Sequence, residues 1–343
     1  MTKPNTLELP PGVQLLYLAE GGANIVYRIV VAPVDMPVAS KEHYAPPAEI
    51  EDACLPQHLR GKLLRLRKDI TSGVPYQENA RNFDRVIRPL FKPGELVDQT
   101  LVRLPKGLVQ RCNEQLRADE LLGKRPKKRH GVYLSTAEPF GLLVTDMTAN
   151  HDPGTCLAEF KPKWLLQSPS APANSKRCRT CALREMKNYD ARKVGAKEER
   201  SFCPLDLVSD NVEDVLRATR FIKGCNDRAR LARLLYRNST LLKLQAHQRV
   251  MKDVGLYGQP AQSREMSISM TLRDCTMYIK MPRNESQPVE IRLGDLDLKT
   301  GAGGKAQYWL DIEKRLINEG WYSGERRGQE HSECALQGPR EKV

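Results

Sequence analysis

Two short segments that lie far apart in the chain place carboxylate and ammonium groups at alternate residues. They are EFKPK at Glu159–Lys163 and DLDLK at Asp295–Lys299. Because side chains of an extended strand alternate between its two faces, we expect each segment to aim acids and bases at one side of a strand. Burying such a row without a partner would be costly, so it predicts a ligand that needs cations and a metal together. A nucleoside triphosphate with magnesium, beside a second highly phosphorylated molecule, meets that demand.

A glycine turn between two predicted strands is a second candidate for phosphate binding. The sequence EGGAN at Glu20–Asn24 separates apolar runs over Val13–Ala19 and Ile25–Val31, which predicts a β-hairpin. Its small residues allow backbone N–H groups to approach phosphate oxygens closely, although a glycine pair in a hairpin is more often simply a tight turn. A third predicted strand, Leu63–Lys68, places Arg65 where protein-kinase-like folds hold a cation against the α and β phosphates.

The elements that must position these groups divide into a strand-rich first part and a helix-rich second part. In the first part, apolar residues spaced by three and four predict a helix over Tyr76–Leu90, and a second helix is expected over Leu108–Leu122. A short apolar strand is expected over Gly141–Asp146. The polar stretch after it predicts a connector between two lobes, residues 1–148 and residues 149–322.

The second part combines longer helices with three strands. Leucines at helical spacing, opposite Arg and Lys, indicate amphipathic helices. The expected helices are Val212–Ile222, Arg228–Val250 and Ala306–Glu319, and the expected strands are Met266–Leu272, Thr276–Met281 and Val289–Leu296. The polar residues 323–343 are expected to form a flexible tail. Together these elements predict an α+β fold.

Composition limits the classes of protein to which the chain can belong. With 343 residues and 40% hydrophobic content, it can bury a sizeable core in two lobes. A formal charge of +13, from 55 Lys and Arg against 42 Asp and Glu, implies attraction to polyanions. Aromatic residues are only 6% of the chain and no nucleic-acid-binding module is recognisable, which argues against a nucleic-acid partner.

The expected location follows from targeting features and from the cysteines. No run of eighteen apolar residues occurs, and the N-terminal sequence MTKP lacks the apolar core of a secretory signal, so neither a membrane span nor export is expected. Nine cysteines without regular spacing fit a reducing compartment better than a disulfide scaffold. We therefore expect a monomer inside the cell, in the nucleus or the cytoplasm.

One pair of cysteines has metal-ligand spacing. Cys178 and Cys181 are separated by two residues, as in a zinc knuckle, and Cys203 could be a third ligand. A second such pair, or a close pair of histidines, is missing from the sequence. Buried or free thiols are therefore the default expectation.

Five motifs in a fixed order resemble the inositol pentakisphosphate 2-kinase family, and they look most like its fungal members. They are EGGAN at 20–24, EFKPK at 159–163, CPLDL at 203–207, RDCT at 273–276 and DLDLK at 295–299. The resemblance implies a two-lobed, distantly protein-kinase-like inositol phosphate kinase fold with ATP and Mg²⁺ as cofactors. It also implies phosphorylation of the 2-hydroxyl of inositol pentakisphosphate, which gives inositol hexakisphosphate. A zinc site that plant and animal relatives have in an insertion before the general-base motif looks absent from residues 210–265.

The resemblance also implies roles for matching residues on the nucleotide side. The ATP phosphates would be covered by Gly21, Gly22, Ala23 and Asn24. Arg65 would contact those phosphates, Asp146 would begin the hinge beside adenine, and Glu159 would bind the ribose. Asp295 matches the magnesium ligand of the family.

On the acceptor side, the resemblance implies one general base and a set of phosphate ligands. Asp274 matches the aspartate that takes the proton from the 2-hydroxyl. The implied ligands of the inositol phosphates are Lys161, Lys163, Arg129, Arg184, Lys299, Lys305 and Tyr308.

Two alternatives stay open. The sequence DLKTG at Asp297–Gly301 also matches the DxKxG pattern of the inositol trisphosphate kinase and multikinase group, but Leu293 stands where that group has a proline. Another inositol polyphosphate kinase is therefore the first alternative. The second is a non-catalytic basic module that binds polyanions such as inositol polyphosphates or RNA. Release of ADP from Mg-ATP and inositol pentakisphosphate distinguishes an enzyme from a binding module.

Overall fold

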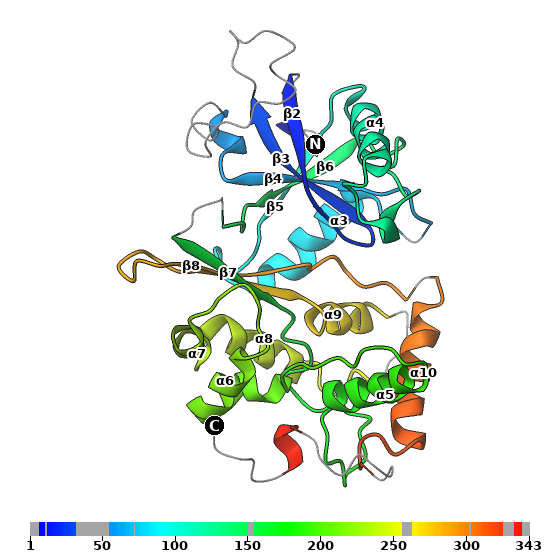
Figure 1. Cartoon of the computed structure of the whole chain (residues 1–343), viewed down its shortest axis with the longest axis vertical. Helices are drawn as coiled ribbons and strands as arrows, with labels where there is room; N and C mark the ends of the chain where they lie inside the picture. Colours follow the sequence, from blue (N-terminus) through cyan, green and yellow to red (C-terminus); the bar gives the residue numbers. More distant parts are fainter. Residues whose placement is uncertain are drawn as a thin grey trace. The chain divides into compact units, whose positions relative to one another are not determined.

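The computed structural model describes residues 7–10, 12–31, 55–71, 73–149, 154–255, 263–301, 303–324 and 333–337. Its helices and strands (Figure 1) divide into two compact units. Unit 1 consists of Met1–Arg85 and Val97–Asp152, and unit 2 consists of Val86–Leu96 and Pro153–Val343. The mixture of helices and sheets confirms the α+β class predicted from the sequence. No described helix combines the length and the apolar character needed to cross a bilayer.

A six-stranded sheet is the main element of unit 1. Its strands have the order β1-β5-β6-β4-β3-β2, and all neighbours are antiparallel except β1 and β5. The bounds are β1 Leu7–Glu8, β2 Val13–Glu20, β3 Asn24–Val31, β4 Lys62–Arg67, β5 Gln99–Arg103 and β6 Phe140–Thr145. Strands β2 and β3 form the predicted hairpin, in which Glu20 pairs with Ile25 across the glycine turn.

The core of unit 1 follows from alternation along these strands. Ile25, Tyr27 and Ile29 of β3 are each at most 2% exposed, because alternate residues of a strand point to the same face. Leu64 of β4 belongs to the same apolar cluster. Helix α4 (Leu108–Leu121), which begins where the sequence predicts, adds Leu116 to this cluster.

The helix predicted over Tyr76–Leu90 is regular only at its start. Helix α3 (Tyr76–Asn82) continues into a π-helical turn, η2 (Phe83–Ile87), and a 3-10 turn, η3 (Arg88–Leu90). Pro89 accounts for the change, because proline donates no N–H and disfavours the α conformation in the residue before it. The turn η3 belongs to unit 2, whereas the 3-10 turns η1 (Gln57–Leu59) and η4 (Lys127–Arg129) belong to unit 1.

Unit 2 combines a three-stranded antiparallel sheet with several helices. The sheet has the order β7-β8-β9, with bounds β7 Thr155–Phe160, β8 Thr276–Pro282 and β9 Glu290–Gly294. The helices are α5 Arg179–Lys193, α6 Val212–Thr219, α7 Arg228–Leu235, α8 Ser239–Val250, α9 Arg264–Leu272 and α10 Lys305–Asn318, with 3-10 turns η5 Pro204–Val208 and η6 Ala335–Gln337. Helices α5 and α10 lie side by side (Figure 1), where Met186 and Leu316 share an apolar cluster with Trp321.

Two predictions about helices and strands in unit 2 are wrong. Met266–Leu272, predicted as a strand, belongs to α9, whose N-cap Ser263 accepts a hydrogen bond from Met266 N. A short apolar run fits a buried strand or a buried helix equally well, and the serine cap favours the helix. The single helix predicted over Arg228–Val250 is interrupted, because Arg237 has a left-handed φ of 51° and Asn238 caps a new helix.

The prediction that both alternating rows of acids and bases lie on strands is wrong for most of their residues. Strand β7 ends at Phe160 and β9 ends at Gly294. Lys163 and Asp295 have φ values of 62° and 54°, which an extended strand does not allow. The charged groups therefore occupy the turns that follow strand ends.

Part of the segment predicted as a flexible tail, residues 323–343, contacts the rest of unit 2. Cys334, just before η6, is fully buried, and its Sγ accepts a hydrogen bond from Cys178 N at 3.1 Å. Residues 333–337 are thus fixed against the beginning of α5 in unit 2.

Candidate active site

Three strand ends meet at one edge of the sheet of unit 2. Strands β7 and β9 both run antiparallel to β8, so Phe160 and Gly294 pair with Met277 and Thr276 at the start of β8. Residues that follow β7, precede β8 and follow β9 are therefore neighbours. These positions hold Lys161 and Lys163, Asp274, and the segment Asp295–Lys299, respectively.

An ion-pair network joins these segments around Asp274. Lys163 Nζ lies 2.8 Å from Asp274 Oδ1, and Lys299 Nζ lies 3.3 Å from Asp274 Oδ2. Lys161 Nζ lies 3.4 Å from Asp274 Oδ1 and 2.7 Å from Asp295 Oδ2, and it also donates to Asp274 O at 2.8 Å. Lys299 Nζ lies 4.0 Å from Asp295 Oδ1. Three ammonium groups thus share two carboxylates.

The charges of this network fix its protonation state. Burial alone would raise the pKa of Asp274, but the hydrogen bond from Lys163 and the charges of Lys163, Lys299 and Lys161 outweigh it and lower that pKa. Burial alone would lower the pKa of Lys161, but the nearby Asp295 and Asp274 outweigh it and raise that pKa. At neutral pH, Asp274 is therefore a carboxylate and Lys161 is an ammonium group.

Backbone strain is concentrated at this network. In the described parts of the chain, the only non-glycine residues with positive φ are Lys163, Arg237 and Asp295. Two of these three belong to the network. Such conformations persist where the surrounding structure over-determines them, and they cluster at functional sites.

Two buried polar side chains hold the strained segments in place. Gln248 of α8 is 2% exposed and donates from Nε2 to Lys163 O and to Leu272 O, both at 3.0 Å. Thr271 of α9, fully buried, accepts a hydrogen bond from Lys299 N at 2.9 Å. Sequence reasoning missed both residues, because a glutamine and a threonine on amphipathic helices give no signal of what their side chains reach.

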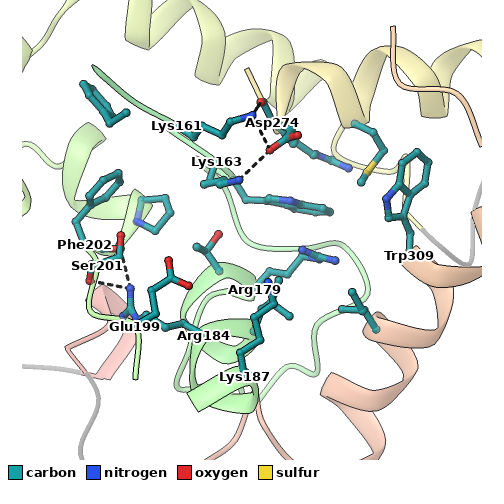
Figure 2. Close-up of a pocket in the computed structure, with 18 of the residues that line it drawn as sticks. Lys161, Lys163, Arg179, Arg184, Lys187, Glu199, Ser201, Phe202, Asp274 and Trp309 are labelled. Atoms are coloured by element: carbon teal, nitrogen blue, oxygen red, sulfur yellow. Dashed lines mark hydrogen bonds and ion pairs between the residues drawn. The ribbon is translucent and has the colours of Figure 1, made fainter. Parts of the chain in front are cut away.

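The network borders a cavity of about 700 Å³ that lies within unit 2 (Figure 2). This volume falls in the range of roughly 300–1,000 Å³ typical of small-molecule sites. The excess of cations in its lining predicts a polyanionic occupant. The charged lining consists of Lys161, Lys163, Arg179, Arg184, Lys187, Lys223, Arg273, Lys299 and Lys305, with the carboxylates Glu159, Glu199 and Asp274.

Two arginines of the lining are bonded to the protein itself. Arg179 Nε donates to Glu313 Oε2 at 2.8 Å, and Arg273 Nη1 donates to Val254 O at 2.9 Å. Both guanidinium groups also stack near the ring of Trp164, with Cζ atoms 4.5 and 3.9 Å from its centroid. Burial lowers the pKa of Arg273 to about 10. Each of these arginines therefore uses at least one donor to hold the wall of the cavity together.

Arg184, a phosphate ligand that the family resemblance implies, lines the cavity and is also bonded within the protein. Its side chain lines the cavity, but Nη1 donates to Ser201 O at 2.7 Å and to Phe202 O at 3.0 Å (Figure 2). Its Nη2 donates to Cys181 Sγ at 3.4 Å. The guanidinium therefore fastens the wall formed by residues 201–202 to α5.

Three lysines of the lining make no ion pair or side-chain hydrogen bond with the described part of the chain. Lys187 lies on α5, Lys223 follows α6, and Lys305 begins α10; all three are exposed. The resemblance implied Lys305 only. Lys187 lies three residues after Arg184, so helical spacing could have placed it on the same face. Lys223 had no such signal, because an isolated bridge to Glu159 brings it to the cavity.

Helix α10 contributes aromatic residues beside its lysine. Tyr308 and Trp309 line the cavity with Lys305, because residues three and four positions apart share one helix face. Tyr308 is 57% exposed. Its hydroxyl is thus accessible to a ligand.

The carboxylates at this edge of the sheet could hold a hard cation. Asp295 and Asp274 keep about two fifths of their side-chain surface exposed, at 42% and 38%. The pKa of Glu159 is raised, mainly by burial. The charge of Lys161 opposes this rise, and the charge of Asp295 adds to it. Carboxylate oxygens are the donors that Mg²⁺ prefers, so this donor set fits magnesium.

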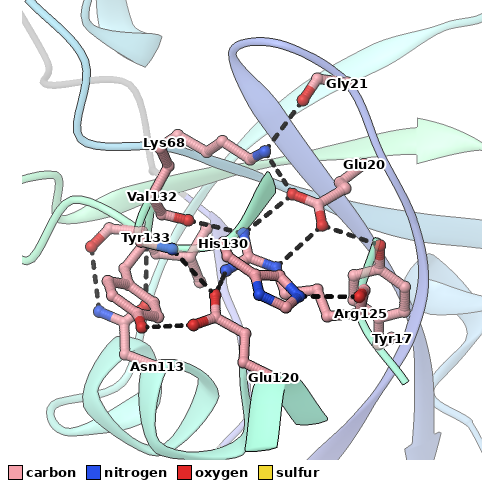
Figure 3. A network of polar contacts seen from close by, with 12 residues as sticks. Tyr17, Glu20, Gly21, Lys68, Asn113, Glu120, Arg125, His130, Val132 and Tyr133 are labelled. Atoms are coloured by element: carbon pink, nitrogen blue, oxygen red, sulfur yellow. Dashed lines mark hydrogen bonds and ion pairs between the residues drawn. The ribbon is translucent and has the colours of Figure 1, made fainter. Parts of the chain in front are cut away.

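In unit 1, a buried ion-pair network fixes the base of the glycine turn (Figure 3). Lys68 Nζ donates to Gly21 O at 2.9 Å and forms a close ion pair with Glu20, and Arg125 Nε lies 2.9 Å from Glu20 Oε1. The side chains of all three charged residues are 1% exposed. A Cβ atom added at Gly22 would meet nothing within 4 Å. The turn is therefore rigid at its base and has open space beside its backbone.

Sequence reasoning selected Arg65 and passed over Lys68. Arg65 lies on β4 with its Cζ 5.5 Å from the centroid of the Tyr76 ring, and Tyr76 donates its hydroxyl to Asn24 Oδ1 at 2.9 Å. Lys68 N donates to Ala23 O at 2.8 Å, so Lys68 holds the glycine turn through its backbone and its side chain. Side chains alternate between the two faces of an extended chain, so those of residues 65 and 68 must point in opposite directions. This alternation could have drawn attention to Lys68.

The two remaining predicted residues of unit 1 lie on turns. Asp146 follows β6, and its Oδ1 accepts hydrogen bonds from Thr148 N and Thr148 Oγ1, both at 2.7 Å. This bonding shapes the segment predicted as the hinge into an Asx turn. Arg129 ends the basic turn η4.

Comparison with known proteins agrees with the motifs. A family described as inositol-pentakisphosphate 2-kinase matches residues 17–226 and 231–315 of this chain. An inositol-pentakisphosphate 2-kinase of Yarrowia lipolytica is 28% identical over 278 residues, covering 76% of this chain and 85% of that protein. One of Debaryomyces hansenii is 27% identical over 342 residues, with the same coverage of both chains. Since the family match spans most of the sequence, the chain belongs to the inositol-pentakisphosphate 2-kinase family.

Proposed function

We propose that this chain is an ATP-dependent kinase that phosphorylates the 2-hydroxyl of inositol pentakisphosphate in the cavity of unit 2. The observation that supports the proposal most strongly is Asp274, a carboxylate held by Lys161, Lys163 and Lys299 at the border of a strongly cationic cavity. A base among cations is the arrangement that transfer between two polyanions requires. The family to which the chain belongs carries the same activity in its name.

Charge balance supports a highly phosphorylated acceptor. Phosphoryl transfer depends mostly on positioning and on electrostatic stabilisation, so the site must neutralise two polyanions that repel each other. Lys187, Lys223 and Lys305 are exposed at the cavity and unpaired within the described residues. They can bind phosphates without breaking a contact within the protein. Lys161, Lys163 and Lys299 can do so by exchanging a carboxylate for a phosphate.

Asp274 is the proposed general base. A carboxylate oxygen of Asp274 accepts the proton of the 2-hydroxyl. The hydroxyl oxygen bonds to the γ-phosphorus of ATP as the bond from this phosphorus to the leaving ADP oxygen breaks. The transition state is loose, so the proton moves late and a carboxylate suffices as the base. The lysines lower the pKa of Asp274, which keeps it ionised and ready to accept a proton at neutral pH.

For the nucleotide, we propose that unit 1 is the N-terminal lobe of a protein-kinase-like fold and supplies the phosphate-binding turn. Gly21, Gly22, Ala23 and Asn24 would approach the phosphates with their backbone. The side chain of Lys68 holds this turn by donating a hydrogen bond to Gly21 O. Arg65 would add a cation, Asp146 would begin the adenine hinge, and Glu159 would bind the ribose.

Asp295 is the proposed ligand of the magnesium that accompanies ATP. Its carboxylate is partly exposed and its backbone is held in a left-handed conformation at the end of β9. Magnesium bound there would neutralise charge on the triphosphate. With Asp295 holding the metal, Lys161 would keep Asp274 as a carboxylate partner and could turn its ammonium group to a substrate phosphate.

Product chemistry tests the proposal. The purified chain is incubated with Mg-ATP and inositol pentakisphosphate, ADP release is measured by a coupled assay, and the product is assigned by phosphorus NMR. We expect ADP and inositol hexakisphosphate in equal amounts. Binding without ADP release would indicate a polyanion-binding module, and transfer to a less phosphorylated inositol in preference would indicate another inositol polyphosphate kinase. Either result would refute the proposal.

A further inference from the structure

Four thiols from three separate parts of the chain meet inside unit 2. Cys178 caps α5, Cys181 lies in its first turn, Cys203 precedes η5, and Cys334 precedes η6. Their sulfur atoms all lie within 4.8 Å of one another. All four residues are at most 2% exposed. This cluster has no part in the proposed reaction, so its presence needs a separate explanation.

The spacing of the sulfur atoms matches one small ion with four ligands. Cys203 Sγ lies 3.8 Å from both Cys178 Sγ and Cys334 Sγ. In a tetrahedral site with zinc–sulfur bonds of about 2.3 Å, neighbouring sulfurs are about 3.8 Å apart. A disulfide would require about 2.05 Å. The four sulfurs therefore have the geometry of a mononuclear tetrathiolate site.

Charges around the cluster distinguish such a site from four packed thiols. Two buried arginines adjoin it: Arg184 donates to Cys181 Sγ at 3.4 Å, and Arg177, which precedes Cys178 in the chain, is 1% exposed. Glu185 Oε1 lies 4.0 Å from Arg184 Nε and supplies one negative charge, and four neutral thiols would add none. Four thiolates around one divalent ion carry two negative charges, which add counter-charge for both arginines. Buried charges are normally paired in this way.

Hydrogen bonds to sulfur point in the same direction. Cys178 N donates to Cys334 Sγ at 3.1 Å, and the bond from Arg184 reaches Cys181 Sγ. Donors aimed at ligand sulfur orient the ligands and stabilise thiolates. Leu205 and Ala335 cover the cluster with apolar groups, which keeps water away from it.

We infer that Cys178, Cys181, Cys203 and Cys334 bind one structural zinc ion. Soft thiolates select zinc over magnesium, and a closed set of four ligands leaves no open position for catalysis. The zinc fastens residues 333–337 to α5 and η5. Through Arg184, which donates to Ser201 O and Phe202 O, it also steadies one wall of the cavity.

Metal content of the full chain tests the inference independently of the reaction. The protein is purified without chelators from cells grown with zinc, and zinc and iron are measured by mass spectrometry. We expect one zinc per chain, released when a mercurial reagent modifies the thiols. Absence of zinc with four thiols free, iron in its place, or a mass showing disulfides in the freshly purified chain would each overturn the inference.

A matched pair of variants locates the site. Cys334→Ser removes one proposed ligand near the C-terminus, and Cys112→Ser changes a buried thiol in unit 1. We expect Cys334→Ser to lower zinc affinity roughly tenfold or more in competition with a chromophoric chelator, whereas Cys112→Ser keeps wild-type affinity. Equal affinity in the two variants would overturn the inference.

Cobalt substitution keeps the test valid if a serine variant folds poorly. Wild-type protein exchanged with Co²⁺ should show the strong visible bands of tetrahedral cobalt and a near-ultraviolet thiolate charge-transfer band. The weak spectrum of octahedral cobalt would contradict a tetrathiolate site.

Discussion

Replacing Asp274 by asparagine removes a charge that three lysines share while it preserves the shape of the side chain. If Asp274 accepts the proton of the attacking hydroxyl, kcat should fall roughly 100- to 10,000-fold, which is the usual contribution of a general base. The asparagine can still accept a hydrogen bond from Lys163, which lies 2.8 Å from Asp274 Oδ1. The geometry of the cavity should therefore survive the substitution.

Asp274→Asn should strengthen the binding of inositol pentakisphosphate, although it lowers kcat. Lys163 Nζ contacts Asp274 at 2.8 Å, and a phosphate bound to the same tetrahedral nitrogen would lie about 5 Å from the carboxylate. At that distance and in a water-like dielectric, the repulsion between two unit charges is about 0.8 kcal/mol. Removing the carboxylate should thus tighten binding of inositol pentakisphosphate roughly fourfold.

Two measurements separate these effects. Coupled ADP release gives kcat, and calorimetry gives the dissociation constant of inositol pentakisphosphate. Asp210→Asn serves as the control, because this acid of unit 2 has a side chain that is 91% exposed and does not line the cavity. A kcat close to that of the control would refute the assignment of the base. A large loss of affinity would show that Asp274 contributes to binding instead.

Four further predictions concern charged residues, three in unit 2 and one in unit 1. Lys161→Ala should weaken binding of inositol pentakisphosphate roughly tenfold and of ATP much less, because its ammonium group belongs to the lysine network; calorimetry showing the reverse preference would contradict this division. The pKa of Asp274 is lowered, so kcat/KM should not decline on the acid side until the pH falls below the usual aspartate pKa of about 3.9. Lys163→Ala removes the hydrogen bond that lowers this pKa, so a pH–rate profile should show the acid limb at higher pH, and an unchanged limb would exclude Asp274 as its source. Glu20→Gln should lower the free energy of unfolding by about 3–5 kcal/mol, because it leaves Lys68 buried without its counter-charge and removes one of the two carboxylates that pair with Arg125. Urea denaturation measures this loss, and exposed Glu78→Gln on α3 should show none of it.

Local patterns in the sequence predicted those helices and strands in which apolar residues recur with a single regular spacing. Strand β3 alternates buried and less buried residues, and Ile25, Tyr27 and Ile29 form its inner face. The hairpin, the basic strand β4 and helix α10 followed in the same way, within a residue or two of their ends. These elements are specified by short-range periodicity and by turn residues, which a single sequence displays directly.

The geometry of the candidate site needed information that no local pattern holds. Lys161, Asp274 and Asp295 meet because three strand ends share one sheet edge, and that pairing depends on the whole unit. The structure brings these residues of the family motifs together, although alternation along strands was the wrong reason for their convergence. Gln248 and Cys334 lacked any signal, since their partners lie far away in the sequence. Long-range contacts of this kind are visible only in the folded chain.

The contacts that keep Asp274 ionised also make it a weak base. Its pKa is low because Lys163, Lys299 and Lys161 surround it, and a carboxylate of low pKa has little affinity for a proton. If the cavity binds substrate phosphates, they would compete for the same ammonium groups. Phosphates that drew the lysines away would weaken the main cause of the lowered pKa and raise the basicity of Asp274. We therefore propose that the lysine network links binding of the acceptor to activation of Asp274 as the base.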